Sequence, residues 1–187
     1  MSMVCVYCAS GPVASDYLAL AADVGTALGR RGHTLVSGGG NVSMMGAVAA
    51  AARAAGARTV GIIPRALMER EVADTDADEL VITETMRQRK QLMDERADGF
   101  ITLPGGIGTL EELFETWTAG FLGMHDKPVV LLDPTDFYAP LLTWLRELVD
   151  QGFVKQDALD RLLVARTVDE AVDLAGATPV TSPATGG

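Results

Sequence analysis

Residues 99–112 read GFITLPGGIGTLEE, an apolar run followed by a glycine cluster and two carboxylates. The apolar run 99–103 predicts a buried strand, and a helix is expected from Gly106 to about Leu122. The glycines between them allow a tight turn with exposed backbone amides. Free amides at a helix start, together with the helix dipole, form a site for an anion. The segment therefore predicts that residues 105–109 hold a phosphate group.

The spacing of these glycines differs from two common phosphate loops. No Lys-Ser/Thr pair follows, as a Walker A loop requires, and the glycines do not lie in the first strand-to-helix turn, where the dinucleotide fingerprint lies. A second cluster, SGGGNVSMMG at 37–46, also leads from an expected strand into a helix. Either cluster alone is compatible with a sharp turn and nothing more. Two such loops in one small sheet favour a phosphorylated ligand.

Similar apolar runs recur along the chain and alternate with helical segments. Further strands are expected at 3–8, 34–36, 59–63, 80–83, 128–132 and 162–165. Further helices are expected at 15–30, capped by Ser15 or Asp16, and at 44–55, 84–97, 136–151 and 168–174. Nearly unbroken apolar strands are typical of a sheet buried on both faces. We therefore expect an α/β fold, a Rossmann-like parallel sheet with helices on both faces, whose ligand binds beyond the carboxyl ends of the strands.

Composition limits the domain count and the partners. The 187 residues suit a single domain over 1–175, and the Ala, Thr, Pro, Ser and Gly-rich tail 176–187 is expected to be disordered. A net charge of −10 argues against binding nucleic acid or an anionic membrane. No apolar run approaches the ~18–20 residues that span a bilayer, and no leader pattern opens the chain, so a cytoplasmic location is expected.

Cys5 and Cys8 form the only Cys-x-x-Cys pair. A redox pair usually opens a helix, whereas this pair lies in an expected strand, and a zinc site needs two more ligands. The two histidines, His33 and His125, lack partner spacing. Buried structural cysteines and no metal site are expected.

Charged residues lie on both sides of the first glycine loop. MRQRK at 86–90 places three cations in an otherwise acidic chain. A solvated helix face explains Arg87 well, whereas Arg89 and Lys90 precede the strand that leads to the loop and are candidates for ligand contact. Glu111, Glu112 and Glu115 follow the loop, where the helix dipole favours carboxylates in any case. A carboxylate beside a sugar phosphate would also stabilise a cationic sugar or activate water.

Together these segments resemble the LONELY GUY family of cytokinin riboside 5′-monophosphate phosphoribohydrolases, formerly often labelled lysine decarboxylases. Residues 104–112 meet the family pattern Pro-Gly-Gly-x-Gly-Thr-x-x-Glu in full, and Arg89-Lys90 matches the preceding Arg-Lys pair. Residues 38–46 match Gly-Gly-Gly-x-x-Gly-Leu-Met-Gly except that Ser43 and Met44 replace glycine and leucine. The resemblance runs from Val4 to about Val164. A serine where the family has glycine predicts strain, because side chains disfavour positive φ.

The resemblance implies hydrolysis of an N-glycosidic bond, in which water attacks C1′ of the ribose and adenine or an N6-substituted adenine leaves. It makes Arg89 and Glu112 the catalytic pair. The residues expected to contact the nucleoside 5′-monophosphate are Ser10, Gly39, Gly40, Met45, Glu71, Met86, Lys90, Gly105, Gly106, Ile107, Gly108, Thr109 and Thr118. No cofactor or metal is implied.

The resemblance also implies a homodimer. The helix after Gly106, with Leu113, Phe114, Trp117 and Phe121, carries more apolar surface than one sheet face needs.

Two alternatives remain open at this point. An amino-acid decarboxylase would need pyridoxal phosphate on Lys90, Lys127 or Lys155. A carrier would bind a nucleotide or cofactor without turnover.

Overall fold

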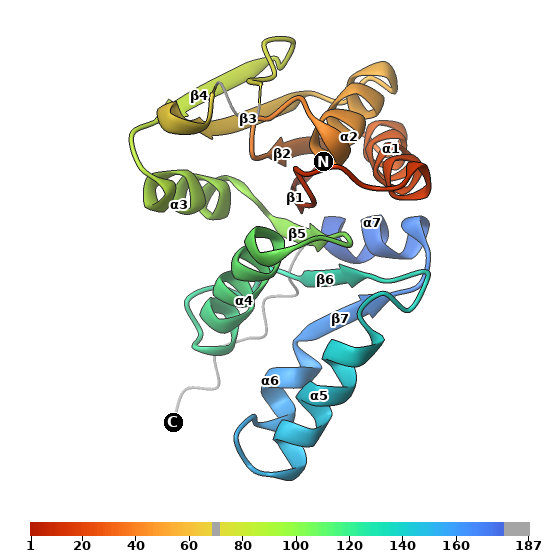
Figure 1. Cartoon of the computed structure of the whole chain (residues 1–187), viewed down its shortest axis with the longest axis vertical. Helices are drawn as coiled ribbons and strands as arrows, with labels where there is room; N and C mark the ends of the chain where they lie inside the picture. Colours follow the sequence, from red (N-terminus) through yellow and green to blue (C-terminus); the bar gives the residue numbers. More distant parts are fainter. Residues whose placement is uncertain (69–71, 178–187) are drawn as a thin grey trace.

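A computed structural model describes residues 1–68 and 72–177. It shows a seven-stranded parallel sheet with the order β4-β3-β2-β1-β5-β6-β7 (Figure 1). The strands are β1 (Met3–Tyr7), β2 (Thr34–Ser37), β3 (Thr59–Pro64), β4 (Glu79–Thr83), β5 (Gly99–Thr102), β6 (Val129–Leu132) and β7 (Leu162–Ala165). The helices are α1 (Ser15–Arg30), α2 (Ser43–Ala54), the 3₁₀ turn η1 (Arg65–Leu67), α3 (Met86–Arg96), α4 (Ile107–Phe121), α5 (Ala139–Asp150), α6 (Gln156–Asp160) and α7 (Val168–Gly176). The Rossmann-like α/β fold expected from the sequence is confirmed.

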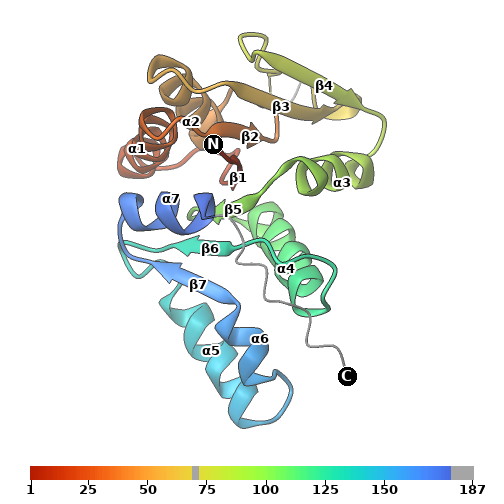
Figure 2. The ribbon, with the colours of Figure 1, turned by 180° about the vertical axis from the view of Figure 1, so that it is seen from behind.

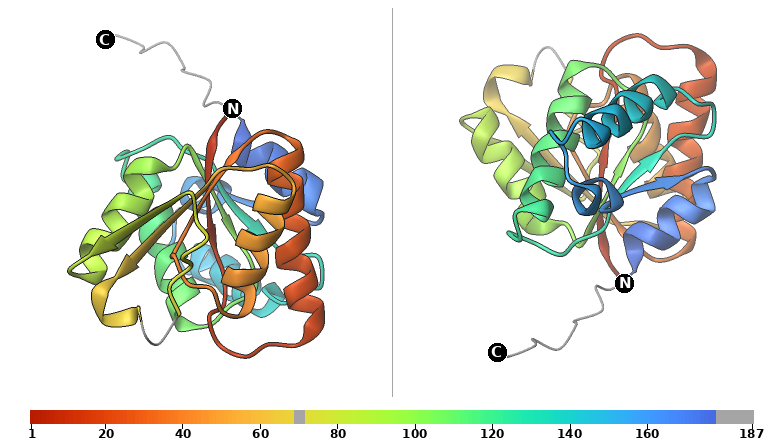
Figure 3. Two further views of the ribbon diagram at one scale, coloured as in Figure 1. Left: turned by 90° about the horizontal axis from the view of Figure 1, so that it is seen from above. Right: turned by 90° about the horizontal axis from the view of Figure 1, so that it is seen from below.

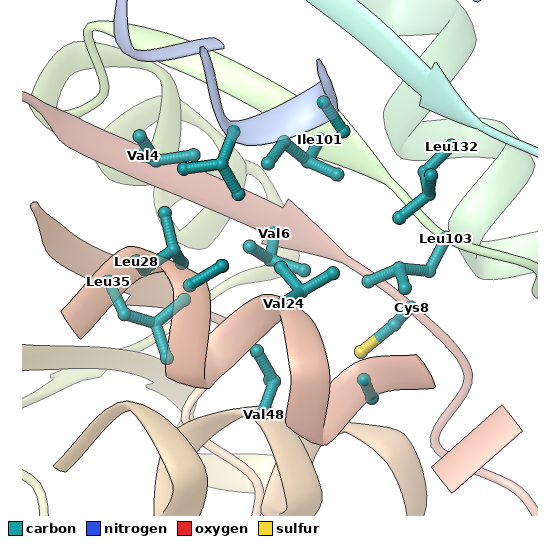
Figure 4. Close-up of a cluster of buried hydrophobic side chains, with 14 of the residues drawn as sticks. Val4, Val6, Cys8, Val24, Leu28, Leu35, Val48, Ile101, Leu103 and Leu132 are labelled. Carbon is teal, nitrogen blue, oxygen red and sulfur yellow. The ribbon is translucent and has the colours of Figure 1, made fainter. Parts of the chain in front are cut away.

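Helices cover both faces of the sheet (Figures 2 and 3). α1, α2 and α7 pack on one face, around a core cluster that includes Val4 and Val6 of β1 (Figure 4). α3, α4 and α5 pack on the other face, around a cluster that includes Cys5 and Tyr7 of the same strand. Alternate residues of one strand therefore enter two cores, which explains why the strands are apolar throughout.

The direction of winding reverses between β1 and β5. From β1 the chain adds β2, β3 and β4 on one side, and it then crosses to β5 and adds β6 and β7 on the other. Loops that follow two such neighbouring strands leave in opposite directions and open a crevice at the carboxyl ends. The loops after β1, β2 and β5 all lie at this edge, because the strands are parallel.

Glycines end two of the helices, and the one predicted cap is wrong. Gly32 and Gly56 follow α1 and α2 with φ of +70° and +88°, the left-handed conformation of a C-terminal stop glycine. The prediction that Ser15 or Asp16 caps α1 is wrong. Ala14 occupies the cap position without a side-chain hydrogen bond, and the Ser15 hydroxyl donates to Asp16 instead.

The C-terminal tail predicted to be disordered lies mostly outside the described residues, since 178–187 are not among them. α7 continues to Gly176, whose carbonyl oxygen accepts a hydrogen bond from the Ser2 hydroxyl at 2.9 Å. The last turn of α7 is thereby tied to the N-terminal segment.

Candidate active site

A cleft of about 440 Å³ lies at the crevice between the carboxyl ends of β1 and β5. Its volume lies in the range of small-molecule sites. The β1 end and its loop, the first glycine after β2, one face of α3 and the first turns of α4 form its walls. The lining residues are Val6–Val13, Gly38, Met45, Leu67, Met86, Arg89, Met93, Gly106–Thr109, Glu111 and Glu112.

Arg89 is fixed inside this cleft by the way α3 begins. Thr85 and Gln88 form a capping box that starts the helix, and this start places Arg89 on its buried face. Only 5% of Arg89 is exposed. Its Nε donates to the Ile62 carbonyl oxygen at 3.2 Å, and its Nη2 donates to the Gly38 carbonyl oxygen at 3.3 Å. The guanidinium charge is therefore held by the backbone of β3 and of the second glycine loop.

Gly38 is needed for this arrangement. A Cβ atom at Gly38 would lie 1.9 Å from Arg89 Nη2, far inside contact distance. The first glycine of the 38–40 cluster thus makes room for the guanidinium. This is a structural reason for glycine that the sequence did not reveal.

Glu112 reaches the same cleft from α4. Its negative charge raises the pKa of Cys5 and of Tyr7, although burial is the larger cause for both groups. Glu112 lines the cleft together with Tyr7, the last residue of β1. The Tyr7 hydroxyl shares a 3.0 Å hydrogen bond with Thr116 Oγ1, one turn after Glu112 on α4. The structure thus brings Glu112 and Arg89, predicted as a pair, to one cavity.

The first turn of α4 has the features of an anion site. α4 begins at Ile107, and its cap residue, Gly106, has no side chain with which to bond the first amides. Gly105 packs directly against Thr109, because a Cβ atom there would lie 2.2 Å from Thr109 Oγ1. Ile107 is 89% exposed, so the start of the helix is open to solvent. Open amides and the helix dipole together favour a phosphate.

The structure gathers most of the other predicted contact residues around this pair. Ser10, Met45 and Met86 line the cleft, together with Gly106, Ile107, Gly108 and Thr109. Gly39, Gly40 and Gly105 are not among the lining residues: Gly39 packs against β3, Gly40 bridges to Ala73, and Gly105 packs against Thr109. Glu71 lies outside the described residues.

Lys90 and Thr118 do not line the cleft of Arg89. Both line a neighbouring groove of about 900 Å³ between α3 and α4. There Lys90 pairs with Glu111 and Glu115, and the hydrogen bonds to these two carboxylates raise the Lys90 pKa. The groove and the cleft share Tyr7, Glu111 and Glu112, so the two cavities adjoin at the candidate catalytic carboxylate.

The sequence did not point to several lining residues, among them Tyr7, Leu67 and Met93. Tyr7 ends β1 at the point of reversal, and its position there is the one signal that was available. Leu67 lies in the 3₁₀ turn after β3, for which no pattern was recognised. Met93 follows Arg89 by four residues and shares its helix face.

The two cysteines are buried, as predicted. Cys5 belongs to the core cluster under α3 and α4, whereas Cys8 lies in the cluster under α1 and α2 (Figure 4). Side chains on opposite faces of a sheet cannot join one disulfide or one metal site. Burial raises the pKa of the Cys5 thiol well above its ordinary value, so this thiol stays protonated. Within 1–68 and 72–177, no group of three or more His, Cys, Asp or Glu residues is placed to hold a metal ion.

The lysines do not suit a Schiff-base cofactor in the cleft. Lys127 donates to the Asp94 carbonyl oxygen at 2.5 Å, Lys155 lies over the Phe121 ring, and Lys90 is paired with two carboxylates. None of these three, the chain's only lysines, lines the cleft of Arg89. Pyridoxal phosphate would have no attachment point there.

No helix in the described part of the chain is both long and apolar enough to cross a membrane.

Known proteins resemble this chain over most of its length. A family model described as "possible lysine decarboxylase" matches residues 45–175. A protein of Mycobacterium marinum named cytokinin riboside 5′-monophosphate phosphoribohydrolase is 57% identical over 169 residues, which cover 90% of each chain. A protein of Mycobacterium tuberculosis with the same name is 56% identical with the same coverage. Among solved structures, a molybdenum cofactor binding protein from Rippkaea orientalis has a TM-score of 0.69 over 92% of this chain and 94% of its own. At 20% identity that likeness concerns the fold alone.

Proposed function

The chain belongs to the LONELY GUY family of cytokinin riboside 5′-monophosphate phosphoribohydrolases, and we propose that its cleft carries out the reaction for which these relatives are named. The chain hydrolyses the N-glycosidic bond of adenosine 5′-monophosphate or its N6-substituted forms, and it releases the free base and ribose 5-phosphate. The observation that carries this proposal is that Arg89 and Glu112, from two different helices, line one cleft with the open start of α4.

The phosphate binds the first-turn amides of α4, at residues 107–109. Glu112 follows this turn by about one further turn, ~5.4 Å along the helix. With the phosphate bound there, the ribose of the nucleotide would lie beside the Glu112 carboxylate. The 5′-phosphate therefore acts as the anchor that sets the reacting carbon in position.

Cleavage proceeds through positive charge on the ribose ring. As the bond from C1′ to the base nitrogen breaks, its electron pair leaves with the base, and the Glu112 carboxylate stabilises the oxocarbenium-like sugar. The oxygen of a water molecule forms the new bond to C1′. Glu112 accepts a proton from this water, and the departing base gains one, so the overall reaction consumes one water. Arg89, held by two carbonyl oxygens, supplies a fixed positive charge that orients Glu112 and the substrate.

A nucleotide or cofactor carrier is the second candidate. The observation in its favour is the shared fold with a molybdenum cofactor binding protein. A carrier needs an anion site but has no use for a buried guanidinium and a carboxylate together. Tight AMP binding without base release would favour the carrier.

A homodimer and a cytoplasmic location also belong to the proposal. Exposed apolar side chains support the dimer: Leu122, Met124, Trp144 and Phe153 are 61%, 74%, 54% and 79% exposed. The cytoplasmic location is a prediction from the sequence alone.

The phosphate anchor is tested by comparing nucleotides with nucleosides. Release of free base is followed chromatographically for AMP and N6-isopentenyladenosine monophosphate, and for the two matching nucleosides. Because each charge-assisted hydrogen bond contributes about 1.5–3 kcal/mol, the loss of two or three should lower kcat/KM by at least ~10²-fold. Equal values for nucleotide and nucleoside would contradict the anchor. No release from any of the four would contradict the proposed reaction.

A further inference from the structure

Ser43 has a backbone conformation that serine rarely adopts. It is the first residue of α2, and its φ is +52°. In the left-handed region a side chain is crowded by its own backbone, and a non-glycine residue remains there only when its surroundings hold it. The family pattern has glycine at this position, and the sequence predicted strain for a serine there. The positive φ of Ser43 confirms that prediction. Something must offset the strain.

The Ser43 hydroxyl makes a contact that glycine cannot make. Its Oγ donates to the Gly11 carbonyl oxygen at 2.5 Å. Gly11 lies in the loop 8–14 between β1 and α1, and residues 10–13 of this loop line the cleft of Arg89 and Glu112. A strained residue on α2 is thus bonded to a wall of the candidate active site.

Few other contacts hold residues 10–13 of this loop in place. In the segments that the structure describes, the Ser43 bond is the one hydrogen bond that ties residues 9–13 to another part of the chain. Ala9 and Val13 add apolar packing against the core under α1 and α2. Ser10, Gly11 and Pro12 are exposed. Their position against the cleft therefore depends on the Ser43 bond.

We propose that Ser43 is a positioning residue, whose hydroxyl holds the loop 8–14 in place as one wall of the substrate cleft. The role in substrate binding rests on the proposed function, whereas the effect on the loop does not. Loss of the bond loosens the wall in the free protein and weakens nucleotide binding, and it leaves the chemistry at Glu112 unchanged.

Three substitutions separate this role from a purely structural one. Ser43→Ala keeps the strain and removes the hydroxyl, and Ser43→Gly removes both. Each should raise KM for AMP about two- to tenfold, the range expected for one hydrogen bond, with kcat little changed. Ser43→Thr keeps the hydroxyl and should have a KM within about twofold of the original protein.

The thermal melts should follow a different order from the KM values. Ser43→Gly relieves the strain and should melt at or above the original Tm. Ser43→Thr should melt lower, because a β-branched residue is more crowded in the left-handed region. A stability effect alone would make KM follow Tm, whereas the proposed role makes KM follow the hydroxyl.

Amide hydrogen exchange of residues 9–14, measured without substrate, gives a second readout that needs no activity. Exchange should be faster in Ser43→Ala and Ser43→Gly and unchanged in Ser43→Thr. Unaltered exchange in Ser43→Gly would overturn the proposal, and so would faster exchange with an unaltered KM. Should the original protein release no base from AMP, the proposed function fails separately, and the dissociation constant of AMP replaces KM in the same comparison.

Discussion

Arg89 is a buried arginine whose guanidinium is held by backbone carbonyl oxygens. Its guanidinium lies against the backbone carbonyl oxygens of Ile62 and Gly38, and 5% of the residue is exposed. A lysine ammonium is compact and cannot reproduce the planar fork that reaches both oxygens. The position of the charge in the cleft therefore depends on the glycine loop behind it as much as on α3.

We predict that Gly38→Ala displaces the Arg89 guanidinium. The added methyl group would lie 1.9 Å from Arg89 Nη2, so the guanidinium must move. Displacing a catalytic group by about 1 Å can cost on the order of 10²-fold, and we expect a fall of that size in kcat for base release from AMP. Arg89→Lys should be similarly severe.

The double variant Gly38→Ala, Arg89→Lys tests whether the glycine acts through the arginine. If it does, the double variant should be little worse than Arg89→Lys alone. If the fold losses in kcat of the two single variants multiply in the double variant, Gly38 has a role separate from Arg89. Thermal melts of all three variants check that each is folded.

The sequence located Arg89 and Glu112, the proposed catalytic pair, and both line the cleft, whereas several of the surrounding residues were not predicted. Arg89 and Glu112 lie in short patterns with fixed spacing, so both could be located without a structure. Lys90 follows Arg89 by one residue, which turns it about 100° around α3, away from the cleft and toward Glu111 and Glu115. The side-chain direction depends on where α3 starts, at Met86 after the Thr85 cap, and the sequence placed this start two residues earlier, at 84. Tyr7 was missed because a strand residue that faces a core and one that borders a cleft look alike in sequence.

Among the elements, β3 and β4 are joined at one end by a side chain. Asp78 accepts hydrogen bonds from Thr59 N at 2.7 Å and Thr59 Oγ1 at 3.1 Å. These bonds, chiefly the one from the backbone amide, lower the Asp78 pKa below its ordinary value. A lowered pKa means that the carboxylate stabilises the fold at pH values above its unfolded pKa. The contribution is lost as the pH falls through the folded pKa.

We therefore predict a pH-dependent effect of Asp78→Ala. Near pH 7 it should lower Tm by about 1–3 °C, a modest value because the carboxylate is exposed and screened. The difference from the original protein should begin to shrink below about pH 4, where the carboxyl group becomes protonated in the unfolded state, and it should be lost as the pH falls through the lowered folded pKa. Asp76→Ala, an exposed carboxylate two residues earlier, is the matched control and should change Tm little at either pH. A difference for Asp78→Ala that stays constant down to pH 3 would contradict this account.

Most elements were predicted because they are long or strongly apolar. α1 and β7 have the expected bounds, and the other long elements differ by a few residues at their ends. α6 was missed because its five residues are too few to show a helical period. The cap of α1 was wrong because a serine at a helix start is ambiguous by one position, and here Ser15 is already helical.

For the whole molecule, strand order decides where the cleft lies. The alternation of strands and helices predicted a parallel sheet, and the glycine clusters predicted which edge carries the site. The order β4-β3-β2-β1-β5-β6-β7 could not be read from the sequence, because it depends on the direction in which each crossover packs. This order places the β1 and β5 loops beside each other, so that one cleft is lined by residues from Val6 to Glu112.

The predicted homodimer needs an interface other than the whole apolar side of α4. Leu113 and Trp117 are buried in the chain's own core, so they are not available to a partner as the sequence suggested. Exposed Leu122, Met124, Trp144 and Phe153 still leave apolar surface that association would cover. Light scattering should give twice the chain mass of 19.7 kDa, or an even multiple of it. A mass of 19.7 kDa at working concentration would contradict the dimer.

Glu112 is proposed to stabilise the cationic sugar in the cleft that it shares with Arg89. The most direct measurement is kcat for adenine release from AMP by Glu112→Gln, which keeps the shape of the side chain and removes its charge. Loss of a preorganised charge of this kind should lower kcat by ~10²–10³-fold. Glu115→Gln is the matched control, because Glu115 lies on the same helix outside the cleft and pairs with Lys90. Near-normal kcat in a folded Glu112→Gln variant, with a large loss in Glu115→Gln, would contradict the account.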